Sequence, residues 1–507
     1  MMSLFKTSIC TVLASGAAAV ILGAPAAAAQ DTTEAAWQHV QNGEVFSVTD
    51  GRGENPVRYR THWDSLVLDT GADGGTTTIS GTAYLRDCDC AAETRPVMFL
   101  FNGGPGASSS PLHFALGPNG REKGDDETSF PDNSDTILRA ADLVFVDPVE
   151  TGFSRAASPD GKSPYLSVHG DVEAVSAFIR EWLQAHERTG APVFVAGQSY
   201  GGFRLAKLLP ELGDLEVEGL VMVSPMLNAG AAAGDMGHVF TLPTMAATAW
   251  RFGKSSIDAE TEADAWEAAR AFAETDYLVA LQRGDLLDAD RETELAGEIG
   301  AMTGLSVELV SASHLRVGIQ DFLEQVLADE NKLVSRLNTA VTQEKRPPAN
   351  PDRPDGANDP SLGLGKSNKI IAEDIGAYLH KMTGLSREDA YRSLNLDANF
   401  AWDWRPEDKR PVFSVNAMPL VGRFMGENEE ARLLVFAGYR DLAVPVLETQ
   451  YALSHAGLPQ DRVSLVKMTA GHSPFDEAAL KAPFATQIYE FITARTVGET
   501  ETGEAAQ

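Results

Sequence analysis

Three side chains that together could activate a nucleophile lie far apart in this chain of 507 residues. Ser199 stands in the motif GQSYG, Asp441 follows the apolar run LLVFAGYR, and His472 follows the run SLVKMTA. A serine hydroxyl is a weak nucleophile until a base takes its proton, and a carboxylate holds the imidazole of that base in the right tautomer. The order Ser, Asp, His is typical of hydrolases with a G-x-S-x-G turn. The sequence therefore predicts Ser199, Asp441 and His472 as a catalytic triad.

The residues around Ser199 indicate a sharp turn between a buried strand and a helix. VFVA, beginning at Val193, has no polar face, which is typical of a central strand in a parallel sheet. After the motif, apolar residues recur at helical spacing as far as Leu209. Such a turn exposes the serine hydroxyl above the sheet, and Gly197 and Gly201 leave room where a Cβ would clash.

A second loop could supply donors for the oxyanion of a tetrahedral intermediate. One donor is expected to be the N–H of Tyr200, the residue after the nucleophile. The other must come from a glycine-rich loop after an earlier strand, and NGGPG at 102–106 supplies such a loop.

The order of the remaining elements predicts the fold class. Buried strands are expected at Val97–Phe101 and in ADLVFVD from Ala141, and an amphipathic helix is expected over Asp171–His186. Alternating strands and helices are typical of an α/β fold with a doubly wound, mostly parallel sheet and helices on both faces. Between Gly43 and Leu85, short β runs separated by turn signals indicate antiparallel hairpins at the sheet edge.

Changes in composition predict the domain organisation. Residues 1–29 have a basic start at Lys6, a short apolar core and an A-x-A exit, which indicate a signal peptide cleaved after Ala29. Residues 30–226 and 406–495 are expected to form the two parts of the core, with 227–405 as a helical cap insertion between them. Residues 496–507 are expected to be an acidic disordered tail.

Composition limits the partners and the compartment. A formal charge of -31 argues against nucleic acid and anionic membranes as partners. After the signal peptide no segment is long and apolar enough for a membrane helix, so a periplasmic or secreted protein is expected. Cys88 and Cys90 are expected to be a loop-borne thiol pair or a local disulfide without a catalytic role. No metal-ligand spacing and no dinucleotide fingerprint occurs, so no metal and no cofactor are expected; the oligomeric state stays open.

Five segments carry a resemblance to a known family: FNGGPGASSS, LVFVDPVETGFSR, GQSYGGFR, GYRDLAVP and AGHSPF. Together they resemble the serine carboxypeptidase family, α/β-hydrolases that remove residues from the free C-terminus of peptides. LPTMAATAW is similar to the bacterial, secreted branch of that family.

The resemblance implies a role for each matching residue. Ser199, Asp441 and His472 become the triad that hydrolyses the peptide bond through an acyl-enzyme, and the amides of Gly104 and Tyr200 become the oxyanion hole. The resemblance also implies that Asn102 and the Gly103 amide bind the terminal carboxylate of the peptide substrate.

Two positions depart from the family pattern. The family usually has one glutamate before the nucleophilic serine and another before a Leu-Gly-Pro segment; here these positions are Gln198 and Ala115. Because Gln198 can donate through its amide without being protonated, we expect it to bind the substrate carboxylate nearer neutral pH. The alternative is that carboxylate recognition has been lost, which would leave an aminopeptidase, an esterase or an acyltransferase of the same fold. A catalytically silent binding protein is a third hypothesis, against which the intact triad argues.

Overall fold

The computed structural model describes residues 37–70, 75–124, 128–157, 163–405 and 415–494. The predicted signal peptide at 1–29 and the predicted tail at 496–507 lie outside these residues, and so does the start of the second core part at 406–414. No described helix combines the length and the apolar character needed to cross a membrane.

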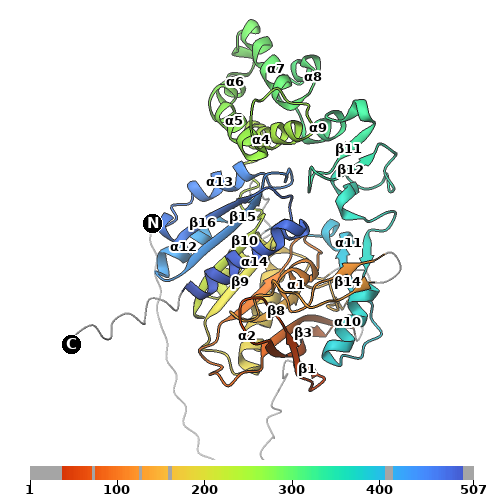
Figure 1. The fold of residues 1–507 in the computed structure, drawn as a ribbon, viewed down its shortest axis with the longest axis vertical. Helices are drawn as coiled ribbons and strands as arrows, with labels where there is room; N and C mark the ends of the chain where they lie inside the picture. Colours follow the sequence, from red (N-terminus) through yellow and green to blue (C-terminus); the bar gives the residue numbers. More distant parts are fainter. Residues whose placement is uncertain (1–36, 71–74, 125–127, 158–162, 406–414, 495–507) are drawn as a thin grey trace, which may run out of the picture. The chain divides into compact units, whose positions relative to one another are not determined.

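A ten-stranded mixed sheet organises the described residues (Figure 1). Its strands are β1 (Trp37–Gln41), β2 (Phe46–Val48), β3 (Val57–Thr70), β4 (Thr76–Arg86), β5 (Val97–Phe101), β8 (Asp142–Asp147), β9 (Val193–Gln198), β10 (Val217–Val223), β15 (Arg432–Gly438) and β16 (Val463–Met468). Their order is β1-β3-β4-β8-β5-β9-β10-β15-β16, and β2 pairs with β3. The strands from β8 to β16 are parallel, whereas β1 to β4 pair antiparallel. The mostly parallel sheet expected from the sequence is confirmed.

The antiparallel edge differs from the expectation at one point. The runs PVRYRTHW and SLVLDT form one continuous strand, β3, of 14 residues. The polar residue between them, Asp64, is fully buried, and its carboxylate accepts hydrogen bonds from Trp182 and from two histidines. A strand can therefore continue through Asp64, because the buried carboxylate is satisfied by side chains that the local sequence does not reveal.

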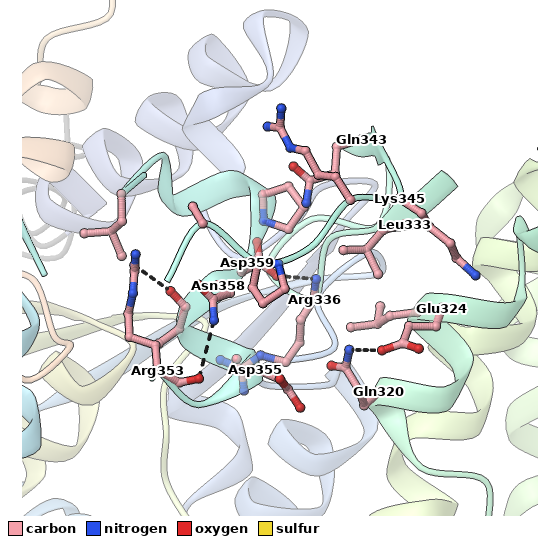
Figure 2. Close-up of a pocket in the computed structure, with 18 of the residues that line it drawn as sticks. Gln320, Glu324, Leu333, Arg336, Gln343, Lys345, Arg353, Asp355, Asn358 and Asp359 are labelled. Atoms are coloured by element: carbon pink, nitrogen blue, oxygen red, sulfur yellow. Dashed lines mark hydrogen bonds between the residues drawn. The ribbon is translucent and has the colours of Figure 1, made fainter. Parts of the chain in front are cut away.

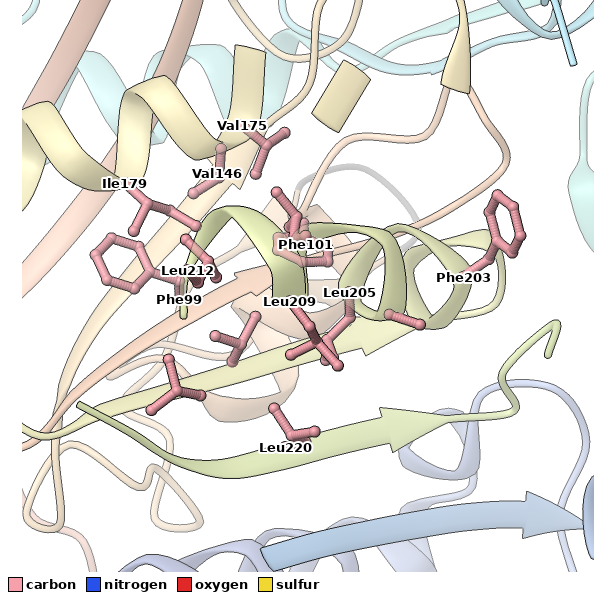
Figure 3. Close-up of a cluster of buried hydrophobic side chains, with 14 of the residues drawn as sticks. Phe99, Phe101, Val146, Val175, Ile179, Phe203, Leu205, Leu209, Leu212 and Leu220 are labelled. Carbon is pink, nitrogen blue, oxygen red and sulfur yellow. The ribbon is translucent and has the colours of Figure 1, made fainter. Parts of the chain in front are cut away.

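Two layers of helices cover the sheet. One face packs against α2 (Val168–Ala185), α3 (Tyr200–Leu208) and α12 (Met418–Glu427); the other packs against α1 (Ser110–Leu116), α10 (Glu373–Thr383) and α14 (Ala478–Thr493). In β5, Val97, Phe99 and Phe101 face the first layer and Met98 and Leu100 face the second. Both faces are buried, as expected for a central parallel strand. Figure 3 shows the first layer around α3, where Leu205, Leu209 and Leu212 meet Phe99 and Leu220.

Helix α2 begins three residues before its expected start at Asp171. Ser167 caps the helix, because its hydroxyl accepts a hydrogen bond from the Gly170 N–H at 3.1 Å. Asp171 then lies in the first turn, where a carboxylate is favoured by the helix dipole.

The region between β10 and β15 contains both helices and small sheets. Its elements are α4 (Asp235–Arg251), α5 (Glu262–Phe272), α6 (Leu278–Arg283), α7 (Ala289–Thr303), α8 (Val307–Ala312), α9 (Ile319–Gln325), α11 (Leu396–Phe400), β11 (Lys332–Val334), β12 (Thr342–Glu344), β13 (Lys369–Ile371) and β14 (Arg392–Asn395), besides α10 and α12. The helices from α4 to α9 share a buried apolar cluster with α13 (Val446–Ser454) and the end of β15. The cap boundaries at 227 and 405 stay a prediction.

Two short features complete the chain. Strands β6 (Glu122–Lys123) and β7 (Thr128–Ser129) form a small hairpin. Cys88 and Cys90 form a disulfide in the loop after β4, which is one of the two states that the sequence left open.

Candidate active site

Ser199 lies at the turn between β9 and α3. Its backbone has φ 60° and ψ -124°, a region that residues other than glycine rarely adopt. Its N–H donates to Val223 at 2.9 Å, and its carbonyl accepts from Met226 at 3.1 Å, so the neighbouring strand end holds the turn. A Cβ at Gly197 would lie 2.2 Å from the Gly201 carbonyl oxygen, so this tight turn requires glycine there. The sequence around Ser199 therefore builds the strained strand-turn-helix that we expected from its motif.

His472 and Asp441 form a hydrogen-bonded pair at the ends of neighbouring strands. His472 Nδ1 lies 2.7 Å from Asp441 Oδ2. The other carboxylate oxygen of Asp441 accepts from the backbone N–H groups of Ala443 at 2.8 Å and Val444 at 3.0 Å. Asp441 is fully buried, whereas the His472 side chain is 14% exposed. The fixed carboxylate orients the imidazole and leaves Nε2 as the nitrogen available to a substrate or a nucleophile.

Ser199 and His472 lie at the same edge of the sheet, since each follows the carboxyl end of a parallel strand. Gln198, the residue before Ser199, donates to the backbone carbonyl of His472 at 3.0 Å, so the two segments are in contact. Among the described residues no hydrogen bond joins the Ser199 hydroxyl to His472. Such a bond often tightens only when a substrate is bound.

The glycine-rich loop at 102–106 packs directly on the Ser199 turn. A Cβ at Gly103 would lie 2.5 Å from the Tyr200 nitrogen and 2.7 Å from the Gln198 carbonyl oxygen. The Tyr200 N–H belongs to the first turn of α3, where backbone N–H groups have no partner within the helix. The loop and the helix start therefore bring backbone N–H groups together beside Ser199.

Buried polar contacts hold this loop in place. Arg204 donates to the Asn102 carbonyl at 2.5 Å and to the Asp171 carboxylate at 2.7 Å. From the other side, the Asn395 N–H donates to the Gly106 carbonyl at 2.8 Å, and the Asn399 amide donates to Pro105 at 3.0 Å. These contacts make Arg204 a structural ion-pair partner of Asp171. The contacts of Asn395 and Asn399 could not be foreseen, because the two residues lie almost 300 positions further along the chain.

Gln198 uses its whole amide within the protein. Its Nε2 donates to the His472 carbonyl at 3.0 Å and to Ser473 Oγ at 2.8 Å, and its Oε1 accepts from the Asn102 amide. Only 3% of the residue is exposed. Gln198 would therefore have to release one of these partners to bind a substrate carboxylate. In this structure it joins the glycine-rich loop to the segment that carries His472.

Neither position where the family has a glutamate carries an acid here, because Gln198 is neutral and Ala115 is apolar. Ala115 is buried in α1, a helix that faces the sheet.

A different acid, Glu448 in the first turn of α13, is 8% exposed. Burial, and secondarily the nearby Asp441, raises the pKa of Glu448 to about 7. Glu448 was not predicted as a site residue from the sequence. The only signal for it there was its position seven residues after Asp441.

A segment from the region between β10 and β15 supports both members of the Asp441–His472 pair. The Leu337 carbonyl accepts from the His472 N–H at 2.7 Å, and the Arg336 carbonyl accepts from the Leu442 N–H at 3.0 Å. Thr339 donates to the Arg440 carbonyl at 3.0 Å. Arg336 also lines a cavity of about 550 Å³ (Figure 2), whose lining includes Arg353 but neither Ser199 nor His472.

Aromatic side chains pack beside the turn. Trp402 and Trp404 meet the Tyr200 ring edge-on, with ring centroids 5.4 and 5.6 Å apart. Trp402 is 9% exposed and belongs to the first helical layer. The two tryptophans therefore pack against the residue that follows Ser199.

The fold and this site define a class of protein: an α/β-hydrolase with a serine at the strand-helix turn and an Asp–His pair on two later strands. The solved structure of Kex1(delta)p, a prohormone-processing carboxypeptidase from Saccharomyces cerevisiae, has the same fold. It superimposes with a TM-score of 0.51 at 13% sequence identity, covering 89% of this chain and 94% of that one.

Sequence comparisons identify a family to which this chain is similar. Residues 85–217 match the family model described as serine carboxypeptidase. Serine carboxypeptidase-like 36 of Arabidopsis thaliana is 23% identical over 389 residues, which are 75% of this chain and 68% of that protein. The pheromone-processing carboxypeptidase KEX1 of Meyerozyma guilliermondii is 30% identical over 148 residues, 29% of this chain and 20% of that protein. The chain is therefore similar to the serine carboxypeptidase family, most clearly over residues 85–217.

The extent of these matches differs along the chain. The family model covers Ser199 and the glycine-rich loop but ends before Asp441 and His472. Serine carboxypeptidase-like 13 of Arabidopsis thaliana, 29% identical, matches over 27% of this chain and 34% of its own length. In that protein and in KEX1, the match therefore spans about a third of the relative or less.

Proposed function

We propose that this chain is a serine-type carboxypeptidase that hydrolyses the C-terminal peptide bond of a substrate with a free carboxylate. The observation that carries the proposal is the 2.7 Å contact of His472 Nδ1 with Asp441, at the sheet edge where Ser199 stands in a strained turn. Similarity to the serine carboxypeptidase family supports the substrate class.

Each residue has a proposed step. His472 Nε2 takes the Ser199 proton as Oγ attacks the scissile carbonyl, and Asp441 stabilises the imidazolium that forms. The amides of Gly104 and Tyr200 bind the oxyanion. His472 then protonates the leaving amine, which departs as the released C-terminal residue, and an activated water hydrolyses the acyl-enzyme at Ser199.

Substrate orientation is assigned to the glycine-rich loop. We propose that the side chain of Asn102 and the Gly103 amide bind the terminal carboxylate, as the family resemblance implies. Gln198 contributes by holding Asn102, and it needs no protonation for its contacts. The proposal therefore includes activity near neutral pH. It also includes export, which the predicted signal peptide would direct.

One observation favours a second function. Because Gln198 is fully used within the protein and Ala115 is apolar, the site has no acid at either family position. An esterase, aminopeptidase or acyltransferase of the same fold would need no carboxylate recognition there.

A set of matched peptides tests the two functions. The same sequence is offered with a free C-terminus, with a C-terminal amide, and with an acylated N-terminus, and the products are read by mass spectrometry. A carboxypeptidase trims the free and N-acylated peptides and leaves the amide intact. Trimming of all three, or loss of activity on N-acylation, would favour the second function.

The Ser199→Ala variant is expected to lose at least about 10⁴-fold in kcat and all labelling by a fluorophosphonate. Persistent labelling would exclude Ser199 as the nucleophile.

A further inference from the structure

Three histidines gather at the antiparallel edge of the main sheet. His39 lies in β1, His62 in β3, and His186 directly follows α2. One ring nitrogen of each lies within 4.8 Å of one ring nitrogen of each of the others. His39 stands opposite Asp64 in the register of β1 and β3, and His62 is two residues before Asp64. The side chains of His39, His62 and Asp64 therefore project from the same face of the sheet.

Asp64 fixes the orientation of two of these rings. Its buried carboxylate contacts His39 Nδ1 at 2.6 Å and His186 Nε2 at 3.1 Å, and it accepts from Trp182 at 3.1 Å. A neutral imidazole has one N–H and one lone pair. When both rings are neutral and donate to Asp64, the lone pair of His39 is on Nε2 and that of His186 is on Nδ1. A carboxylate that takes the second ring N–H is the usual device that orients metal-binding histidines.

His62 is the unexplained member of the cluster. It is 8% exposed, and neither of its ring nitrogens has a hydrogen-bond partner among the residues that the structure describes. Its ring centroid lies 4.8 Å from that of His39 and 5.4 Å from that of His186. A buried polar group without a partner is costly, and a shared cation would satisfy this one.

We propose that His39, His62 and His186 bind one divalent transition-metal ion of the kind that prefers imidazole, with Zn²⁺ as the first candidate. Tetrahedral Zn²⁺ with nitrogens at 2.0–2.1 Å holds them about 3.4 Å apart, so separations of up to 4.8 Å between the ring nitrogens have to shorten by up to about 1.4 Å. The His39 side chain is 34% exposed on the edge strand and can turn to allow this. Three imidazoles leave the fourth position to water.

The proposed metal has a structural task. It would connect the edge strand β1 to β3 and to the end of α2. Asp171, at the other end of α2, contacts Arg204 beside the Ser199 turn. The fifteen positions from Asp171 to His186 correspond to about 22 Å along a helix, so the metal is distant from the candidate active site.

Metal binding is tested on the full chain produced without a polyhistidine tag and freed of metal by a chelator. Titration with Zn²⁺ followed by calorimetry is expected to give one equivalent with a dissociation constant in the micromolar range or below, and a higher midpoint of thermal unfolding. With Co²⁺ in its place, the absorption spectrum of a four-coordinate nitrogen site is expected. The His39→Gln variant, altered at a partly exposed position, and the His62→Phe variant are each expected to weaken Zn²⁺ binding by roughly 100-fold or more.

The matched control is His314→Ala, which removes a histidine whose side chain is 73% exposed and which lies outside the cluster. This variant should bind Zn²⁺ as the unchanged chain does. Absence of stoichiometric uptake by the unchanged chain would overturn the proposal and leave a His39–Asp64 ion pair with packed rings. Equal uptake by His39→Gln and His62→Phe would also overturn it, by placing the metal elsewhere. Because the readouts are binding and unfolding, neither outcome depends on peptidase activity.

Discussion

At the scale of single residues, Gln198 connects the parts of the candidate site. Its amide contacts the carbonyl of His472, the hydroxyl of Ser473 and the side chain of Asn102. A side chain with both a donor and an acceptor can satisfy this set at any pH, whereas a carboxylate can donate to the His472 carbonyl only when it is protonated.

The Gln198→Glu variant should therefore depend on acid. At pH 7.5 its kcat/KM on a C-terminal peptide should fall on the order of 10-fold, because an ionised carboxylate would face a carbonyl oxygen. Activity should recover as the pH falls toward 5, and a pH profile of kcat/KM measures this. The control is Gln184→Glu, at an exposed position of α2. A profile that keeps the shape of the unchanged enzyme's would contradict the role given to Gln198.

Glu448 gives a second prediction at this scale. Its pKa is raised from the usual range to about 7, chiefly by burial. Between the unfolded and folded pKa values the folded state binds more protons than the unfolded state, so the free energy of unfolding decreases as pH rises through this window. Ionisation of Glu448 then costs up to about 3 kcal/mol above pH 7.

The Glu448→Gln variant should consequently unfold at a higher temperature than the unchanged protein at pH 8.5, and this advantage should vanish at pH 5. Thermal unfolding at the two pH values measures the difference. Glu430→Gln, at an exposed position after α12, serves as the control. An equal shift at both pH values would show that the effect does not come from the ionisation of Glu448.

At the scale of elements, the candidate site depends on close contact between the loop after β5 and the start of α3. A Cβ at Gly103 would meet the nitrogens of Tyr200 and Gly201 at 2.5 and 2.8 Å. The Gly103→Ala variant should therefore separate the two segments and lower kcat on the order of 100-fold, since small displacements of catalytic groups are costly. Gly190→Ala is the matched control, because a Cβ there meets nothing within 4 Å. Unchanged kcat in Gly103→Ala would show that the contact is not needed.

The strands that position this site could be predicted from the sequence, but the contacts that hold its loops could not. Val97–Phe101 and the run ending at Asp147 are apolar on both faces, a pattern that is typical of central strands in a parallel sheet covered by helices on both sides. The triad order and the NGGPG loop likewise identified the candidate residues. In contrast, the support of His472 by Leu337 is a backbone hydrogen bond, which leaves no signature in residue types. The histidine cluster was missed for a related reason: its members come from three elements and have no metal-ligand spacing.

At the scale of the whole molecule, we expect the formal charge of -31 to surround the protein with a negative field. Such a field raises the local concentration of positively charged substrates and lowers that of negatively charged ones, and salt screens it. The value of kcat/KM should be several-fold higher for a lysine-containing peptide than for its glutamate counterpart at 10 mM salt. The difference should shrink at about 0.5 M salt. If the ratio of the two kcat/KM values does not change with salt, the preference for the lysine peptide comes from contacts in the substrate pocket and not from the field.

The segment around Leu337 has a consequence for recombining this protein with its relatives. Although it lies in the region between β10 and β15, its backbone holds the loops of Asp441 and His472. A chimera that exchanges that whole region would also replace the support of its own histidine. Grafting a foreign version of that region onto this core should therefore succeed only when residues 335–339 are kept from the host.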